Sequence, residues 1–155
     1  SPKVRRVKAV PIEKGRRTVV YSLELKGLRG GEQLAVRARL ATSAARLPEA
    51  ARITTRLFLA DEPDQREPGG EAKRVASFNG HVSRFNGFNC LPEDERSVTE
   101  KVGALRITRA PSKPLYLNLV AVSAAPFGRI PAGSGLPVLD DGWIKAVRYP
   151  PDLDG

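Results

Sequence analysis

The fold is decided by the stretch Thr18-Val19-Val20-Tyr21-Ser22-Leu23-Glu24-Leu25-Lys26, in which apolar and polar side chains alternate. Val19, Tyr21, Leu23 and Leu25 fall on one face of an extended chain, and the residues opposite them are mostly polar. A period of two over this length is typical of a β-strand that buries one face and exposes the other. The stretch therefore predicts a half-buried strand of an antiparallel sheet.

Four further segments alternate in the same way: Gln33–Thr42, Ala51–Ala60, Leu115–Ser123 and Trp143–Tyr149. In 115–123 apolar residues occupy both faces, so we expect both faces to be covered. Weaker strand candidates are Val4–Val10, Arg74–Phe78, His81–Phe88 and Val98–Thr108. Turns rich in glycine and proline separate these runs, and one of them is Glu67-Pro68-Gly69-Gly70. At most one helical turn is expected, within Ser43–Arg52, which Pro48 interrupts.

These segments predict an all-β fold, an antiparallel two-sheet sandwich of jelly-roll type with about eight or nine strands and little or no helix. A closed barrel is the alternative. The 155 residues, of which 41% are hydrophobic, suffice for one core. We expect a basic arm over 1–17, a single sandwich domain over 18–149 that includes a long loop over 124–142, and a tail over 150–155.

Positive charge is concentrated at the N-terminus. The formal net charge is +9, and residues 1–17 hold seven basic residues against one acidic residue. Such an arm can bind an anionic polymer or an acidic patch on a partner, although it can also be a solvated terminus. The residues predicted to make these contacts are Lys3, Arg5, Arg6, Lys8, Arg16 and Arg17.

The sequence contains no recognisable motif for catalysis or for cofactor binding. A single cysteine, Cys90, and a single histidine, His81, exclude cysteine-based zinc sites and histidine-rich metal sites. No glycine-rich phosphate loop opens a helix, and His81 has no nucleophile or carboxylate at a recognised motif spacing. We therefore expect a protein that is not an enzyme and that uses no cofactor.

Clustered carboxylates offer a weak alternative to this expectation. Calcium takes several hard oxygen ligands, and the loops of this chain contain pairs of acids that can supply some of them. The calcium candidates are Asp61, Asp64, Asp140 and Asp141. The competing interpretation is that these residues are solvated loop acids.

The long loop and the aromatic residues are the remaining candidates for contacts. Residues 124–142 contain three prolines and four glycines and show no strand period. Their apolar residues either cover the body of the domain or form an assembly interface, and they are Phe127, Ile130, Leu136, Val138 and Leu139. A sugar ring would instead be contacted by Phe85, Asn86, Phe88 and Trp143. The alternative for the Phe-Asn-Gly repeat at 78–80 and 85–87 is a tight hairpin with buried phenylalanines.

Three blocks of the chain carry a resemblance: Gly27–Leu34, Asn86–Cys90 and Pro114–Val120. They resemble blocks of small exported β-sandwich proteins of high-GC bacteria, a group with no assigned activity. In that group a second cysteine follows the Asn-Cys block, whereas Ser97, Val98 and Thr99 stand there in this chain. The resemblance implies export and says nothing about chemistry.

The chain contains no methionine and begins Ser1-Pro2, which indicates removal of an initiator methionine or of a leader. No apolar run approaches the ~20 residues of a membrane-spanning helix, so we expect no transmembrane segment. An extracellular or surface-associated location is expected, with a virion as the other candidate.

Three classes of function follow from these observations. The first is a structural or assembly protein of a surface layer, filament or viral particle, which contacts other copies or a protein partner through the arm and the long loop. The second is a carbohydrate-binding module. The third is binding of a polyanion or nucleic acid by the basic arm, which salt would weaken steeply.

Overall fold

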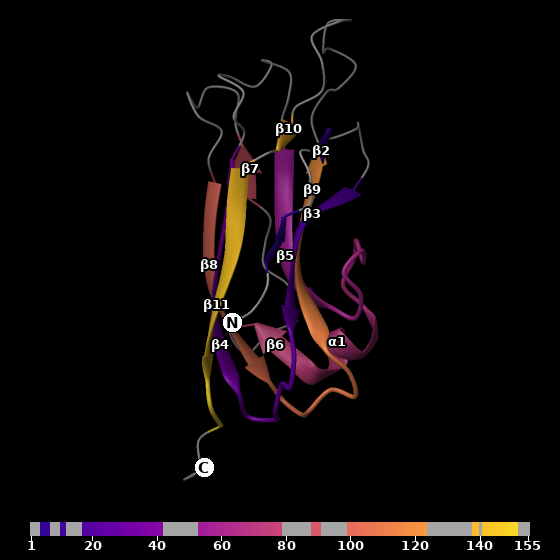
Figure 1. Ribbon diagram of the computed structural model, residues 1–155, viewed down its shortest axis with the longest axis vertical. Coiled ribbons are helices and arrows are strands. Elements are labelled where there is room, and N and C mark those ends of the chain that lie inside the picture. The colour runs from indigo at the N-terminus through magenta and orange to yellow at the C-terminus, as the bar shows by residue number, and fades with distance from the viewer. Residues whose placement is uncertain are drawn as a thin grey trace, which may run out of the picture.

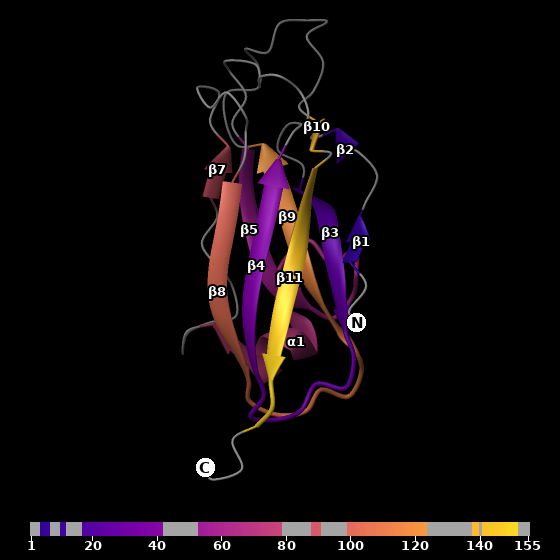
Figure 2. The same cartoon turned by 60° about the vertical axis from the view of Figure 1, so that its left-hand side comes forward.

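A computed structural model describes residues 4–6, 10–11, 17–41, 53–78, 88–90, 99–123, 138–139 and 141–151. Most of these residues are in β-strands, which form two antiparallel sheets stacked face to face (Figures 1 and 2). The strand content and the two stacked sheets confirm the predicted all-β sandwich.

Among the described residues, no helix has both the length and the apolar character needed to cross a membrane.

The five-stranded sheet has the order β1 (Val4–Arg6), β3 (Arg17–Leu25), β9 (Leu115–Ser123), β5 (Ile53–Ala60) and β7 (Phe88–Cys90). The four-stranded sheet has the order β11 (Asp141–Tyr149), β4 (Gln33–Ala41), β8 (Thr99–Ile107) and β6 (Ala76–Phe78). A short ribbon pairs β10 (Val138–Leu139) with β2 (Val10–Pro11). One short helix, α1 (Gly70–Val75), precedes β6.

Successive strands from β3 to β9 alternate between the two sheets, so each connection crosses the sandwich. β3 pairs with β9 in one sheet, while β4, the next strand of the chain, pairs with β8 in the other. This interleaving is the topology of a jelly roll, in which an antiparallel ribbon is rolled into two sheets. The alternative of a closed barrel is wrong, because the strands form two separate sheets.

The core lies between the inner faces of the two sheets. The five-stranded sheet contributes Tyr21, Leu23, Leu25, Leu57, Leu59, Leu115, Leu117 and Leu119. The four-stranded sheet contributes Leu34, Val36, Ala38, Leu105, Ile107 and Ile144. Each fully buried leucine or isoleucine contributes about 1.5–3 kcal/mol relative to an exposed one, so this contact is the main source of stability. The alternation predicted for these strands is confirmed at the inward-facing positions named here.

A β-bulge in β3 changes one prediction. Val19 pairs with Val120 and Tyr21 pairs with Leu119, so Val20 is an extra residue in this strand. Val19 therefore packs on the outer face with Phe58 and Val120 instead of lying beside Tyr21 and Leu23. The expectation that Val19 shares the face of Tyr21 is wrong.

Other differences concern the termini and the loops. Val4–Arg6 is an edge strand on β3, and Arg17 is the first residue of β3, although the sequence places these residues in the arm. Val138 and Leu139 pair with β2, and Asp141 and Gly142 begin β11, so the expectation that 124–142 pairs nowhere is wrong at these positions. Helix α1 stands where a turn and a strand were predicted. The helical turn predicted within Ser43–Arg52 lies outside the described residues.

An ion pair between Glu32 and Arg148 links the β3–β4 connection to β11, and the sequence did not predict it. Glu32, which is only 3% exposed, accepts a hydrogen bond from the Arg29 main-chain N–H at 2.9 Å. Its carboxylate also pairs with the guanidinium of Arg148 on β11. Arg148 further donates to the carbonyl oxygens of Lys26 at 2.6 Å and Gly27 at 3.1 Å. The β3–β4 connection is thus fastened to the C-terminal strand.

Burial alone would raise the pKa of Glu32, because it disfavours the charged carboxylate. The hydrogen bonds from Arg148 and from the Arg29 main chain outweigh burial and lower the pKa below its usual value. Protonation of Glu32 is therefore disfavoured by folding, and the stabilisation it provides is present above the unfolded-state pKa, about 4.3. That stabilisation is lost as the pH falls through the lower pKa of the folded state.

We predict that Glu32→Gln lowers the free energy of unfolding by about 1–3 kcal/mol at neutral pH, because Arg148 loses its buried counter-charge. Urea unfolding between pH 7 and pH 2 measures this, and the gap between wild type and variant should narrow at acid pH. The control is Glu24→Gln, since Glu24 forms a looser pair with exposed Lys26 at 3.9 Å. Equal losses in the two variants, or a constant gap at every pH, would contradict the assignment.

Candidate functional site

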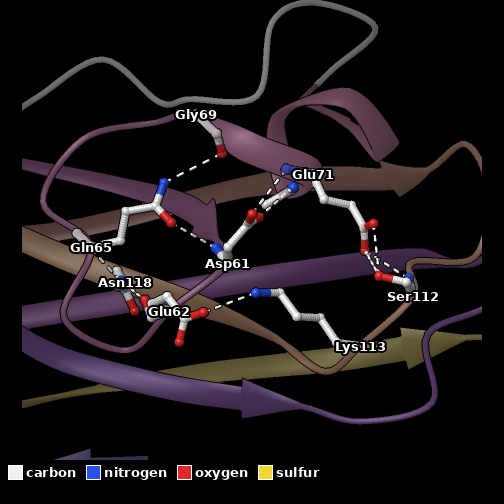
Figure 3. A network of polar contacts seen from close by, with 9 residues as sticks. Asp61, Glu62, Gln65, Gly69, Glu71, Ser112, Lys113 and Asn118 are labelled. Carbon is white, nitrogen blue, oxygen red and sulfur yellow. Dashed lines mark hydrogen bonds and ion pairs between the residues drawn. The ribbon is translucent and has the colours of Figure 1, made fainter.

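The predicted calcium candidates are not gathered into a metal site among the described residues. The carboxylate of Asp61 accepts hydrogen bonds from the main-chain N–H groups of Glu71 at 3.0 Å and Ala72 at 2.6 Å (Figure 3). Asp64 is exposed, Asp140 lies outside the described residues, and only the backbone of Asp141 is described. In the described part of the chain, no three acidic, cysteine or histidine side chains come together as metal ligands. Asp61 serves instead as the cap of α1.

The loop that contains Asp61 is fixed across the outer face of the five-stranded sheet. Asn118 on β9, which is 0% exposed, donates to the carbonyl oxygens of Glu62 at 2.9 Å and Gln65 at 3.0 Å. Its own carbonyl accepts the Ser22 hydroxyl at 2.6 Å. Phe58, which lies opposite Asn118 in the register, is completely buried. Residues 61–69 therefore cover the outer face around Asn118, Ser22 and Phe58.

The other acids near this loop also have internal partners. Glu71 accepts hydrogen bonds from the hydroxyl of Ser112 and from its main-chain N–H, and these bonds lower the pKa of Glu71. Lys113 donates to Glu62 at 2.8 Å, which raises the pKa of Lys113. Arg17, one of the predicted polyanion contacts, is paired with Glu67. These charges hold the loop in place and are largely neutralised within the chain.

Most of the other predicted contact residues have no described side chain. Lys3, Lys8, Arg16, Phe85, Asn86, Phe127, Ile130 and Leu136 lie outside the described residues. The backbones of Arg5 and Arg6 belong to β1, that of Phe88 to β7, and those of Val138 and Leu139 to β10. Of the predicted sugar contacts, Trp143 is the residue whose side chain is described.

Trp143 lies on the outer face of the four-stranded sheet, which Figure 2 shows turned toward the viewer. Along β11, Trp143, Lys145, Val147 and Tyr149 alternate with Ile144 and Ala146, which face the core. Val147 is 55% exposed and Tyr149 is 53% exposed, and both are large apolar residues. This half of the sandwich therefore presents apolar side chains to solvent.

The register shows which residues lie beside them. Lys145 pairs with Arg37 on β4, Val147 pairs with Ala35, and Tyr149 pairs with Gln33. Across β4, Ala35 pairs with Ala104 on β8, and Gln33 pairs with Arg106. We call this surface the open face, and it consists of Gln33, Ala35, Arg37, Ala104, Arg106, Trp143, Lys145, Val147 and Tyr149. Past Trp143, the register continues to Arg39 and Glu100, of which only the backbones are described.

The open face combines positive charge with aromatic rings. Its charged side chains in the described set are all basic, namely Arg37, Arg106 and Lys145. The ammonium group of Lys145 lies 4.6 Å from the centroid of the Trp143 ring, which is a cation–π contact. Between the row of Lys145 and the row of Tyr149 lie Val147, Ala35 and Ala104, which carry no charge. The arrangement offers stacking and ionic contacts, and it provides no pair of groups for nucleophilic or acid–base catalysis.

No protein-family model, no curated protein and no solved structure matches this chain. The function therefore has to be inferred from the chemistry of its own surfaces.

We predict that the covered face depends on Gly70, the first residue of α1. Gly70 has a φ of +69°, and a Cβ at this position would lie 2.2 Å from Oδ2 of Asp61. Gly70→Ala should therefore lower the free energy of unfolding by about 1–3 kcal/mol, as measured in urea, because of backbone strain and displacement of the capping carboxylate.

The matched control is Gly69→Ala. Gly69 has an extended backbone with a φ of 165°, and its nearest neighbour to an added Cβ is 4.0 Å away. This variant should differ from wild type by less than about 0.5 kcal/mol. Similar losses at both positions would show that the Asp61 cap is not the reason for a glycine at position 70.

Proposed function

We propose that this protein is a non-enzymatic contact domain, which joins a surface layer, filament or viral particle by binding another macromolecule through its open face. The observation that supports this is the difference between the two outer faces of the sandwich. Residues 61–69 cover the part of one outer face around Asn118, whereas the other outer face presents Val147 and Tyr149 more than half exposed. Val147 and Tyr149 are neighbours on one face of β11, and Ala35 and Ala104 continue the row of Val147, so these apolar side chains are contiguous. Contiguous exposed apolar patches, unlike single exposed residues, are typical of interaction surfaces.

The composition of the open face supports the same proposal. Tryptophan, tyrosine and arginine are enriched in binding interfaces and among the residues that contribute most to affinity. Trp143, Tyr149, Arg37 and Arg106 belong to this group. The arm and the loop over 124–142 remain predicted contact elements of the same assembly, and the export implied by the resemblance agrees with a place at a surface.

Carbohydrate binding is the second candidate function, and Trp143 and Tyr149 favour it. Both aromatic side chains lie on the same face of β11, where each can stack on a sugar ring. Polyanion binding by the arm has less support from the described residues, since Arg17 is paired with Glu67.

We predict that Val147→Ser combined with Tyr149→Ser abolishes binding without unfolding the domain. Both side chains are more than half exposed, so the melting temperature should change by only a few degrees. The measurement is sedimentation of the full chain alone and with insoluble envelope fragments of the producing cells. Wild type should sediment with the fragments or in larger assemblies, and the double variant should remain a monomer in solution.

The control is Lys73→Ser with Arg74→Ser, two exposed residues at the end of α1. This pair should behave as wild type. The proposal fails if wild type stays monomeric and unbound under both conditions, or if the Val147 and Tyr149 variant sediments as wild type does.

A further inference from the structure

The open face ends at β11, which is the longest strand edge without a neighbour in the described part of the chain. β11 pairs with β4 over all nine of its residues and with no other described strand. The strands at the other three sheet edges, β1, β6 and β7, have three residues each. Proteins commonly keep edge strands short, because the main-chain groups along an edge can pair with another chain. β11 is the exception to this pattern.

The large apolar side chains that are exposed among the described residues also belong to β11. They are Val147, which is 55% exposed, and Tyr149, which is 53% exposed. Bulges and prolines within an edge strand discourage pairing with another chain. β11 pairs with β4 without a bulge, and Pro150 and Pro151 follow the strand instead of interrupting it. The same strand therefore offers a main-chain edge and an exposed apolar surface.

We propose that β11 binds β11 of a second copy as an antiparallel strand, which joins the two four-stranded sheets into one continuous sheet. This inference rests on the proposed function and names a second copy of the chain as the macromolecule bound at the edge of the open face. A two-fold axis perpendicular to the sheet relates the copies, so the same strand serves both partners. The two open faces then lie side by side on one surface of the joined sheet.

The alternation of side chains limits the register of this pairing. The axis must lie level with a residue, because a shift of one position would place outer side chains opposite core-facing ones. An axis at Lys145 places two lysines directly opposite each other, which destabilises a sheet. An axis at Ile144 places Tyr149 opposite Leu139, which already pairs with Val10 in β2. Both registers are therefore unfavourable.

An axis at Ala146 gives the longest ladder that remains. It pairs residues 143–149 of the two copies, whereas an axis at Val147 pairs only 145–149. With the axis at Ala146, Tyr149 of one copy lies opposite Trp143 of the other, and Val147 lies opposite Lys145. Both exposed apolar residues of β11 thus gain a neighbour across the strands, and such pairs stabilise a sheet.

The charged side chains near the axis permit this register. The ammonium group of Lys145 lies 4.6 Å from the centroid of the Trp143 ring, so the side chain leans along its own strand, away from the axis. The two lysines of the pair therefore diverge, and the aliphatic stem of each can pack on Val147 of the other copy. Arg148 is neutralised by Glu32 within its own chain.

A charge at position 147 tests the pairing, because this position lies opposite Lys145 of the second copy. Sedimentation equilibrium of the full chain over a range of concentrations gives the dissociation constant of the dimer. Two-fold symmetry makes each contact twice, so we expect Val147→Glu to dimerise at least about tenfold more tightly than Val147→Lys. Val147→Lys combined with Lys145→Glu should recover most of the affinity that Val147→Lys alone loses.

Cysteine crosslinking with a short bismaleimide tests the register in a Cys90→Ser background, which is also the blank. Val147→Cys makes two diagonal neighbours across the axis, about 7–8 Å apart. Tyr149→Cys puts the thiols about 20 Å apart, because each lies six positions along the strand from its counterpart. Ala104→Cys, at an exposed position of the open face on β8, lies farther still from its counterpart. Val147→Cys should crosslink at least about tenfold faster than the other two.

Circular dichroism and melting curves show whether each variant is folded, and either charge at position 147 stays solvated in the monomer. The pairing is overturned if wild type is monomeric at every concentration, if Val147→Glu and Val147→Lys dimerise equally, or if Tyr149→Cys crosslinks as fast as Val147→Cys. If envelope fragments bind through Val147 and Tyr149 while wild type stays monomeric, the contact function stands and the pairing of two copies fails. If wild type neither binds fragments nor dimerises, both fail.

Discussion

The buried amide of Asn118 is the interaction on which the two sides of this molecule depend. It lies on β9, the middle strand of the five-stranded sheet, and bonds Ser22 on β3 as well as the main chain of residues 62 and 65. A buried amide must have partners, because an unpaired one costs about 1–3 kcal/mol. Here the partners include the loop of residues 61–69, so satisfying Asn118 also fixes this loop over the adjacent part of the outer face. The four-stranded sheet has no comparable buried polar group on the described part of its outer face, which is exposed.

The strands could be predicted from the sequence because the signal for them is local. The alternation of Trp143, Lys145, Val147 and Tyr149 along the chain is enough to place them on one face of a strand. Their neighbours could not be predicted, since Arg37 and Arg106 come from strands more than 35 residues away in the chain. The concentration of positive charge in residues 1–17 led to the prediction that the arm makes the ionic contacts. Among the described residues, the basic side chains that lie near aromatic rings are on the four-stranded sheet.

Two local features of the fold differ from the sequence prediction, and each difference has a physical cause. The bulge after Val19 inserts one residue into a strand whose period looks unbroken, and nothing in the composition of Thr18–Lys26 marks it. Helix α1 is only six residues long, begins at Gly70 directly after Gly69, and takes its cap from Asp61, which lies outside the helix. The ion pair of Glu32 with Arg148 joins positions 116 residues apart, so only the assembled fold brings them together.

The interleaved strand order also determines how the chain can fold. β4 pairs only with β8 and β11 among the described strands, so it has no native partner until residue 99 has been synthesised. Until β9 has been synthesised, β3 has only the three-residue edge strand β1 as a native partner among the described strands. Non-local pairing of this kind slows folding to milliseconds or seconds and leaves apolar strands unpaired in the nascent chain. The N-terminal half, with its leucine-rich strands, is therefore the part of this protein that is prone to aggregation during synthesis and that has most to gain from a chaperone.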